Sequence, residues 1–180
     1  TVVLLVAAFF AMTKMPEPEK GEKLRFDRTI FRHKHLVYAV IAQLFYVGAQ
    51  AGIWGITIDY IVDLLGVSKE TASAGYMIFG TLLFVIGRFL GTFIMSYIKD
   101  TKILAVYGVL AAVMCLVAAT GAGKMAVYAV LGVNFFMSIM FPTIFALGVK
   151  DLGHQTKLGS SFIIMAIIGG AILPPVMGVI

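Results

Sequence analysis

The feature that most constrains this chain is a series of long apolar runs that carry almost no charge. A helix that spans a membrane needs roughly 20 mostly apolar residues. Five runs of about that length follow one another, and only Arg88 interrupts one of them: Leu36–Ile58, Thr71–Ile98, Ile103–Gly123, Met125–Val149 and Leu158–Ile180. Strands of a membrane barrel would instead be about 10 residues long with strict alternation. The sequence therefore predicts an all-α integral membrane protein.

Composition supports this interpretation and excludes several classes of function. The chain is 61% hydrophobic and 13% charged, whereas soluble domains carry roughly 25% charged residues. The net charge of +5 does not indicate a nucleic-acid partner, because the basic residues lie between apolar runs and form no stripe with aromatic stacking residues. The one cysteine, Cys115, rules out a disulfide within the chain. No catalytic constellation or metal-ligand cluster is evident, so the sequence predicts neither an enzyme nor a metal site.

The runs divide the chain into three segments. Residues 1–13 have the composition of the end of a membrane helix, residues 14–35 form a polar linker, and residues 36–180 form a bundle. The helices predicted in the bundle lie at about 36–62, 73–98, 103–121, 125–149 and 158–180. Because both ends of the chain fall inside apolar runs, we expect a fragment that is cut within membrane helices.

Positive charge sets the expected orientation in the membrane, because Lys and Arg accumulate in cytoplasmic loops. The linker 14–35 and the loops around Lys99 and Lys150 carry most of the Lys and Arg residues between the runs. The alternate loops, around Lys69 and Lys124, carry one each. We therefore expect the linker to be cytoplasmic.

The first full run carries a stripe of amide and aromatic side chains. At 100° per residue, Gln43, Gln50 and Thr57 fall within about 40° of one another, and Tyr46 and Trp54 flank the same face. Amides can both donate hydrogen bonds to hydroxyl groups and accept them, and an aromatic ring can pack on the apolar face of a sugar. The stripe is suited to a neutral polyol, and hydrogen bonding between helices is the alternative.

Arg88 is the one charge well inside a run. It lies about 16 Å along the helix from Lys99, which is deep for an interfacial residue. It is flanked by Gly87 and Gly91, whose small-xxx-small spacing lets a neighbouring helix approach closely. A buried Arg needs a carboxylate or several carbonyls, and this chain offers no carboxylate at that depth. Arg88 is therefore either a conformational lock or a site residue.

A second polar face occurs in the fourth run. Asn134, Ser138 and Phe141 lie on one side of the predicted helix. Pro142 removes a backbone hydrogen bond and should bend the helix at that point. Bent helices in carriers often mark the binding site or a gate, and a simple packing kink is the alternative.

Several longer motifs carry a resemblance to a known family. They are AQLFYVGAQ at Ala42–Gln50 with Trp54 beyond it, IGRFLGT at Ile86–Thr92, FMSIMFPTIF at Phe136–Phe145 and TKLGSSF at Thr156–Phe162. In this order they resemble the fucose–galactose–glucose:proton symporter family of the major facilitator superfamily. The resemblance covers roughly Leu36–Gly178.

The resemblance implies a twelve-helix major facilitator fold, of which this chain covers the end of helix six to most of helix eleven. Members of the family move a neutral sugar together with a proton, by alternating access between two six-helix halves in the bacterial inner membrane. The implied partners are the sugar, the lipid bilayer and the N-terminal half of the same chain, and the implied coupling ion is a proton, with no cofactor. The candidate substrate-binding residues are Gln43, Tyr46, Gln50, Trp54, Asn134 and Phe141. The candidate gating or structural residues are Gly87, Arg88, Gly91 and Pro142.

Two departures from the family pattern limit what the resemblance implies. Phe141 stands where the fucose carriers have Tyr, which weakens the case for fucose and keeps glucose and galactose open. The protonated carboxylates of the family belong to the first half, so no residue of this chain is assigned as the proton carrier. The sequence predicts a proton-coupled transporter of a neutral hexose or deoxyhexose. The alternative is a major facilitator carrier of another solute, such as a drug or an anion.

Overall fold

The structure confirms the helical membrane fold. The computed structural model describes residues 28–178, so the predicted helix end at 1–13 and most of the linker at 14–35 lie outside the described residues. Within the described range, five helical spans are long and apolar enough to cross a membrane. These spans are Lys34–Leu65, Lys69–Met95, Asp100–Ala119, Lys124–Val149 and Gly153–Met177.

The spans begin a few residues before the predicted starts, because charge-free runs exclude the polar first turn of each helix. Asp100 opens one span, where its charge suits the positive end of the helix dipole. Ser68 caps another by accepting a hydrogen bond from the Thr71 N–H at 3.3 Å. The first span, α2 (Lys34–Leu65), ends at Gly66, which has a left-handed φ of 65° that glycine adopts without strain.

Three of the spans are interrupted. The second consists of α3 (Lys69–Thr71), a π-helical stretch η2 (Ala72–Met77) and α4 (Ile78–Met95). The third is the continuous α5 (Asp100–Ala119), and the fourth is divided into α6 (Lys124–Met137) and α7 (Met140–Val149). The fifth consists of η3 (Gly153–Gln155), α8 (Thr156–Met165), the 3₁₀ turn η4 (Ala166–Ile168) and α9 (Gly169–Met177). A further 3₁₀ turn, η1 (Arg28–Arg32), precedes α2.

The break between α6 and α7 has a cause in the sequence. Pro142 has no N–H to donate to the carbonyl of Ser138, four residues earlier. The helix stops at Met137 and restarts at Met140, and the Thr143 N–H restores the pattern by donating to Ile139 at 3.1 Å. The structure therefore shows the interruption that Pro142 predicts.

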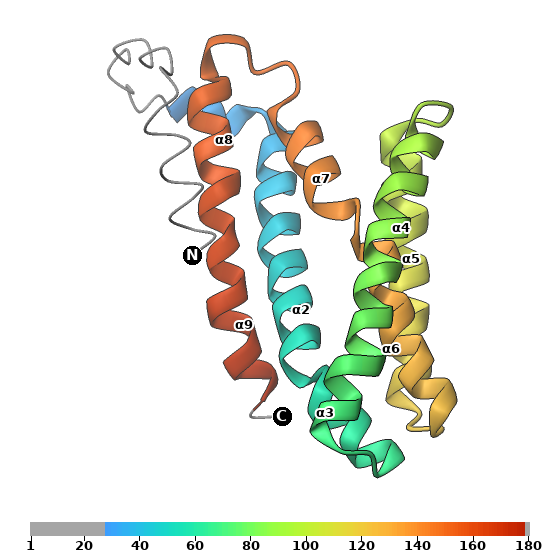
Figure 1. Ribbon diagram of the computed structural model, residues 1–180. Helices are drawn as coiled ribbons and strands as arrows, with labels where there is room; N and C mark the ends of the chain where they lie inside the picture. The colour runs from blue at the N-terminus through green and yellow to red at the C-terminus, as the bar shows by residue number, and fades with distance from the viewer. Residues whose placement is uncertain (1–27, 179–180) are drawn as a thin grey trace, which may run out of the picture.

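The helices form two groups that α7 connects (Figure 1). The first group is α2 with α8 and α9, which lie alongside it, and the second is α4, α5 and α6. The connections from α4 to α5 and from α7 to α8 lie at the same end of the molecule as the start of α2. This is the end at which the sequence places the loops rich in Lys and Arg.

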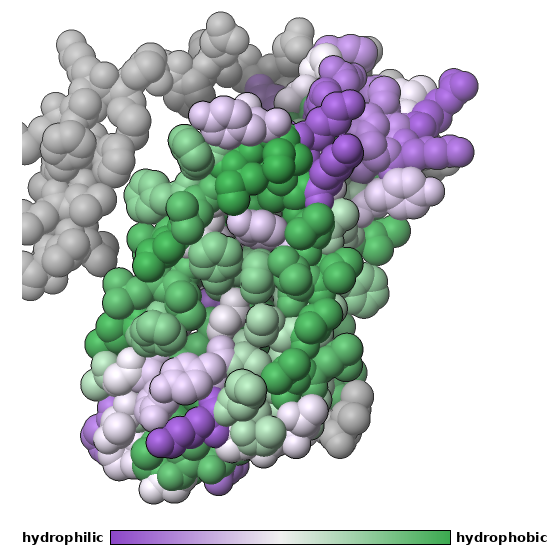
Figure 2. Space-filling model, turned by 90° about the vertical axis from the view of Figure 1, so that its right-hand side faces the viewer, coloured by the Kyte–Doolittle hydropathy of each residue, from purple (hydrophilic) through white to green (hydrophobic). Residues whose placement is uncertain are grey.

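The outer surface of the bundle is apolar. Figure 2 shows a broad hydrophobic band between polar ends. Large apolar side chains such as Phe89, Phe93 and Leu116 are mostly exposed on the helices. A patch of this extent is stable only against lipid or another apolar partner, which agrees with a protein that crosses the membrane several times.

Glycines bring α4 directly against the break in the fourth span. The only buried residues of α4 are Gly80, Gly87 and Gly91. A Cβ at Gly87 would meet the Phe135 carbonyl, and one at Gly91 would lie 2.6 Å from Ile139. The close approach that the Gly87 and Gly91 spacing predicts is therefore present.

Candidate functional site

The residues of the predicted stripe on α2 differ in how deeply they are buried. Gln43, Tyr46 and Thr57 are buried, Gln50 is half-buried, and Trp54 is 47% exposed. The Thr57 hydroxyl donates to the Ile53 carbonyl of its own helix at 2.5 Å. Among the residues of the stripe, Gln50 and Trp54 are therefore the ones that a solute could reach without a rearrangement of the helices.

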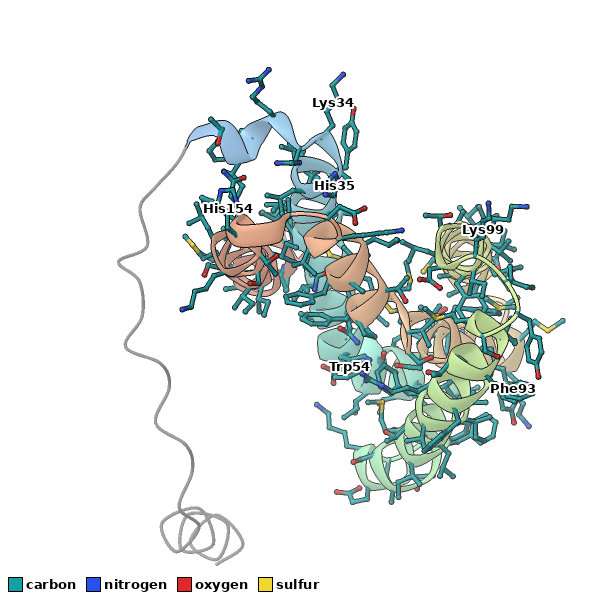
Figure 3. All side chains as sticks on the ribbon, turned by 90° about the horizontal axis from the view of Figure 1, so that it is seen from above. Lys34, His35, Trp54, Phe93, Lys99 and His154 are labelled. Carbon is teal, nitrogen blue, oxygen red and sulfur yellow. The ribbon has the colours of Figure 1, made fainter. Side chains whose placement is uncertain are left out.

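Trp54 is held by residues from two other spans. Its Nε1–H donates to the Asn134 Oδ1 of α6 at 2.7 Å. Its ring also contacts Phe84 of α4 edge to face, with centroids 6.0 Å apart. Asn134 is fixed in turn, because its Nδ2 donates to the Leu131 carbonyl at 3.2 Å. Figure 3 shows Trp54 between the two groups of helices, whereas Phe93 lies at the outer edge.

A small cavity of about 120 Å³ lies beside this contact. It is lined by Trp54, Met77, Gly80, Thr81, Phe84 and Asn134. Neither Phe84 nor Thr81 was a candidate from the sequence, because a single Phe or Thr in a membrane span does not stand out as Arg88 does in the same span. The signal that points to them is the π-helical stretch η2, which ends just before them at Met77, since π-helical turns occur often at functional sites.

The fourth span supplies the other candidates near its break. Phe141 is half-buried, and its ring lies 6.5 Å from that of Tyr46, between centroids. The Ser138 hydroxyl donates to Phe135 at 2.7 Å. The Tyr46 hydroxyl donates to the Met137 carbonyl at 2.8 Å, which links α2 to the last residue before the break. The Tyr46 hydroxyl therefore stabilises the end of α6 at the break, and it is not directed to a solute.

Removing that hydroxyl should destabilise the bundle. In the Tyr46→Phe variant, the Met137 carbonyl loses its side-chain donor while the ring remains. We expect the free energy of unfolding to fall by about 1 kcal/mol, the usual net value of one hydrogen bond. Thermal unfolding in detergent measures this, with the exposed Tyr38 changed to Phe as the control. Equal unfolding temperatures for the two variants would contradict the role given to the Tyr46 hydroxyl.

Arg88 is exposed in this structure. Among residues 28–178 no salt bridge to Arg88 is found, and its own carbonyl accepts the Thr92 hydroxyl at 2.7 Å. The ion pair that is present joins Lys69 to Asp59 at 2.9 Å, near the end of α2. A role of Arg88 as a lock or a site residue remains a prediction, and its partner is not supplied by the described part of the chain.

A second, larger cavity of about 420 Å³ has a different character. It lies between α2, α5 and the two parts of the fourth span, and its lining is mainly apolar, with residues such as Phe45, Leu104 and Met140. It presents none of the candidate amides. This cavity is poorly suited to a molecule covered with hydroxyl groups, so the Trp54 cavity is the better candidate for a polyol.

Comparison with known proteins identifies the relatives of this chain. No family model matches it. It is 40% identical to the L-fucose-proton symporter of Escherichia coli, over 98% of this chain and 42% of that protein. It is 37% identical to a putative glucose/galactose transporter of Helicobacter pylori, over 98% of this chain and 44% of that protein. The chain therefore spans less than half the length of these curated relatives.

A solved structure agrees with these relatives. The crystal structure of a variant of the Escherichia coli fucose:proton symporter matches 99% of this chain and 45% of that protein, with 41% sequence identity and a TM-score of 0.84. The chain belongs to the fucose–galactose–glucose:proton symporter family. Within this family it corresponds to the C-terminal half of the major facilitator fold. The named relatives are transporters, and the absence of a catalytic site from this chain remains a prediction.

Proposed function

We propose that this chain is part of a secondary active transporter that carries a neutral hexose or deoxyhexose, such as fucose, galactose or glucose, together with a proton. The observation that carries the proposal is the arrangement around Trp54. Its exposed ring lies between the two helix groups, its N–H is held by Asn134, and Gln50 lies one turn away on the same face of α2. The names of the relatives support the choice of substrate class.

These groups have the chemistry that a sugar requires. Because the indole N–H is already bonded to Asn134, the ring is fixed and its face is available to the apolar C–H surface of a pyranose. The Gln50 amide can both donate hydrogen bonds to sugar hydroxyl groups and accept them, and the Thr81 hydroxyl, which donates to the Met77 carbonyl at 2.9 Å, can accept one. No residue lining the Trp54 cavity is charged. A neutral solute therefore fits this site better than an anion, which would need convergent cations.

Alternating access requires parts of the bundle to change their relative positions. The break at Ser138 and Ile139, next to Pro142, is suited to act as a hinge. Gly87 and Gly91 hold α4 against this hinge, and Arg88 between them is placed to lock one arrangement through a partner outside the described residues. Phe141 lies in the first turn of the movable segment α7 and packs on Tyr46 of α2. The contact between Phe141 and Tyr46 would therefore change when α7 moves.

Proton coupling is proposed to depend on the remainder of the protein. In the described chain, Asp59 and Asp63 lie near the end of α2, and Asp59 is paired with Lys69. Neither carboxylate lies at the middle of a span, where proton relays are usual. We therefore propose that the N-terminal half supplies the titrating carboxylate. The distribution of Lys and Arg supports a cytoplasmic position for the linker, and the bacterial relatives support the inner membrane of a bacterium as the location.

A carrier of another solute is the second candidate. The apolar cavity of about 420 Å³ is the observation that favours a hydrophobic, drug-like substrate. Changing Gln50 to Leu separates the two candidates. A sugar carrier should lose most of its uptake, whereas a carrier that uses the apolar cavity should keep its uptake.

Uptake by the complete carrier in sealed proteoliposomes tests the proposed function. Labelled fucose, galactose and glucose are supplied with and without an inward proton gradient. We expect one of these sugars to accumulate only when the gradient is present. If folded protein accumulates none of them, the sugar assignment fails while the family membership stands. Accumulation without any gradient would reject proton coupling alone.

A further inference from the structure

The side chain of Gln43 is enclosed and lacks a hydrogen-bond partner. It is 0% exposed, and neither its Oε1 nor its Nε2 has a partner within hydrogen-bond distance. Four other buried polar side chains of the spans differ, because Thr57, Asn134, Ser138 and Thr143 each donate to a carbonyl. Gln43 is therefore an exception among them, and a buried amide without partners destabilises the arrangement that contains it.

Gln43 lies opposite the beginning of α7. One turn before it, Ala39 contacts Gly148 near the end of α7. One turn after it, the Tyr46 hydroxyl bonds to Met137, the last residue of α6. Because the two spans run antiparallel, Gln43 falls between these contacts, at the level of the first turn of α7. It thus lies beside the segment whose backbone pairing Pro142 interrupts.

The fifth span is interrupted at the same level. The 3₁₀ turn η4 ends at Ile168, and the next residue, Gly169, packs so closely on Leu44 that a Cβ at Gly169 would meet the Leu44 carbonyl. Leu44 is the neighbour of Gln43 in the chain. Both spans that pack against α2 at this height are therefore irregular, and irregular helix turns can exchange their backbone partners more easily than continuous helices can.

An amide is suited to such surroundings. Its carbonyl accepts hydrogen bonds and its NH₂ group donates two. The carbonyl of Ser138 has no N–H four residues later to bond, since that position is Pro142. A change in the angle between α6 and α7, or between α8 and α9, would bring backbone groups of the irregular turns toward Gln43. The arrangement that provides these partners gains free energy relative to the one described here.

We propose that Gln43 is a conformational switch residue, whose amide is unpartnered in this arrangement of α7 and α9 and bonds to the interrupted backbone in the other arrangement of the transport cycle. Gln43 then favours movement of the hinge and does not bind the sugar directly, whereas Gln50 remains the amide that a solute can reach. Assigning the second arrangement to the transport cycle rests on the proposed function, whereas the proposal that two arrangements exist is independent of it.

The Gln43→Met variant of the complete carrier tests this, because Met keeps the length of the side chain and removes its polar atoms. Gln50→Met makes the same change on the same helix at a half-buried position and serves as the control. Backbone hydrogen–deuterium exchange is followed in Met140–Val149 and Gly169–Met177, in nanodiscs without sugar. Thermal unfolding is measured in parallel, and sugar uptake is measured separately in proteoliposomes.

We expect Gln43→Met to slow exchange in both segments by about tenfold, the equilibrium shift that one hydrogen bond typically supports. Its unfolding temperature should rise and its uptake rate should fall, while Gln50→Met leaves exchange unchanged. Faster exchange, a lower unfolding temperature or a failure to fold would show that the amide is partnered at rest, and would overturn the proposal. Equal slowing in both variants would also overturn it. If Gln43→Met slows exchange but the unaltered carrier moves none of the sugars, the switch is supported and the proposed substrate is rejected instead.

Discussion

Replacing Trp54 by Ala in the complete carrier should lower the affinity for sugar by about thirtyfold or more. Truncation of an aromatic anchor at the centre of a binding surface typically costs about 2 kcal/mol or more, and each 1.4 kcal/mol is about a tenfold change in affinity. The loss should be large because the substitution removes the ring face and also leaves Asn134 Oδ1 without its donor at 2.7 Å. The half-saturation concentration for proton-driven uptake measures the effect.

Two further variants separate the ring face from the other contributions. Trp54→Phe keeps an aromatic face but loses the N–H that orients it, so it should weaken uptake less than Trp54→Ala. Phe93→Ala removes an aromatic side chain of α4 that is 63% exposed and lies at the outer edge of the molecule (Figure 3). That variant should retain uptake within about twofold, in line with ordinary surface substitutions. Uptake by Trp54→Ala equal to that of Phe93→Ala would exclude Trp54 from the binding site.

Much of the fold follows from the sequence because the membrane imposes one strong rule. Every backbone polar group in lipid must be hydrogen-bonded within the protein, and an apolar run of about 20 residues achieves this as a helix. The break before Pro142 was also predictable, because Pro142 has no N–H to donate to the carbonyl four positions earlier. The π-helical stretch Ala72–Met77 has no comparable signal. Its residues would be acceptable in an ordinary α-helix.

The site was less predictable, because the periodicity of a single helix predicts the direction in which a side chain points but not how deeply neighbouring helices bury it. Gln43 and Gln50 are seven residues apart, so they point in nearly the same direction but lie about 10 Å apart along α2. The interrupted segments α7 and η4 cover the level of Gln43, and Gln50 remains half-buried. The contact between Trp54 and Asn134 joins residues 80 positions apart. Such a pair depends on which helices are neighbours, which periodicity does not determine.

Among the Gly→Ala substitutions in α4, Gly87→Ala should produce the largest loss of stability. A Cβ at this position would meet the carbonyl oxygen of Phe135 and would lie 2.8 Å from the Ser138 Oγ. These two atoms are themselves joined by a hydrogen bond of 2.7 Å. A backbone carbonyl cannot turn aside as a flexible side chain can, so α4 must move away from the hinge.

The sign of the effect follows from comparing two magnitudes. Ala is favoured over Gly in a helix by about 1 kcal/mol, whereas forcing an extra carbon into a tight contact costs about 1–3 kcal/mol and occasionally more. Because the obstructing atom belongs to the backbone, we expect the upper part of that range, and a net loss of about 2 kcal/mol. Loss of monodisperse protein on heating in detergent measures it.

Two other glycines give the expected order. A Cβ at Gly55 meets nothing within 4 Å, so Gly55→Ala should leave stability unchanged or raise it. A Cβ at Gly91 would meet the side chain of Ile139, which can shift, so Gly91→Ala should lie between the other two. If Gly87→Ala is as stable as Gly55→Ala, the close approach of α4 to the hinge is wrong. If the predicted order is observed, α4 and the break in the fourth span form one packed unit, so that movement at Ser138 and Ile139 must carry α4, and with it Arg88, along.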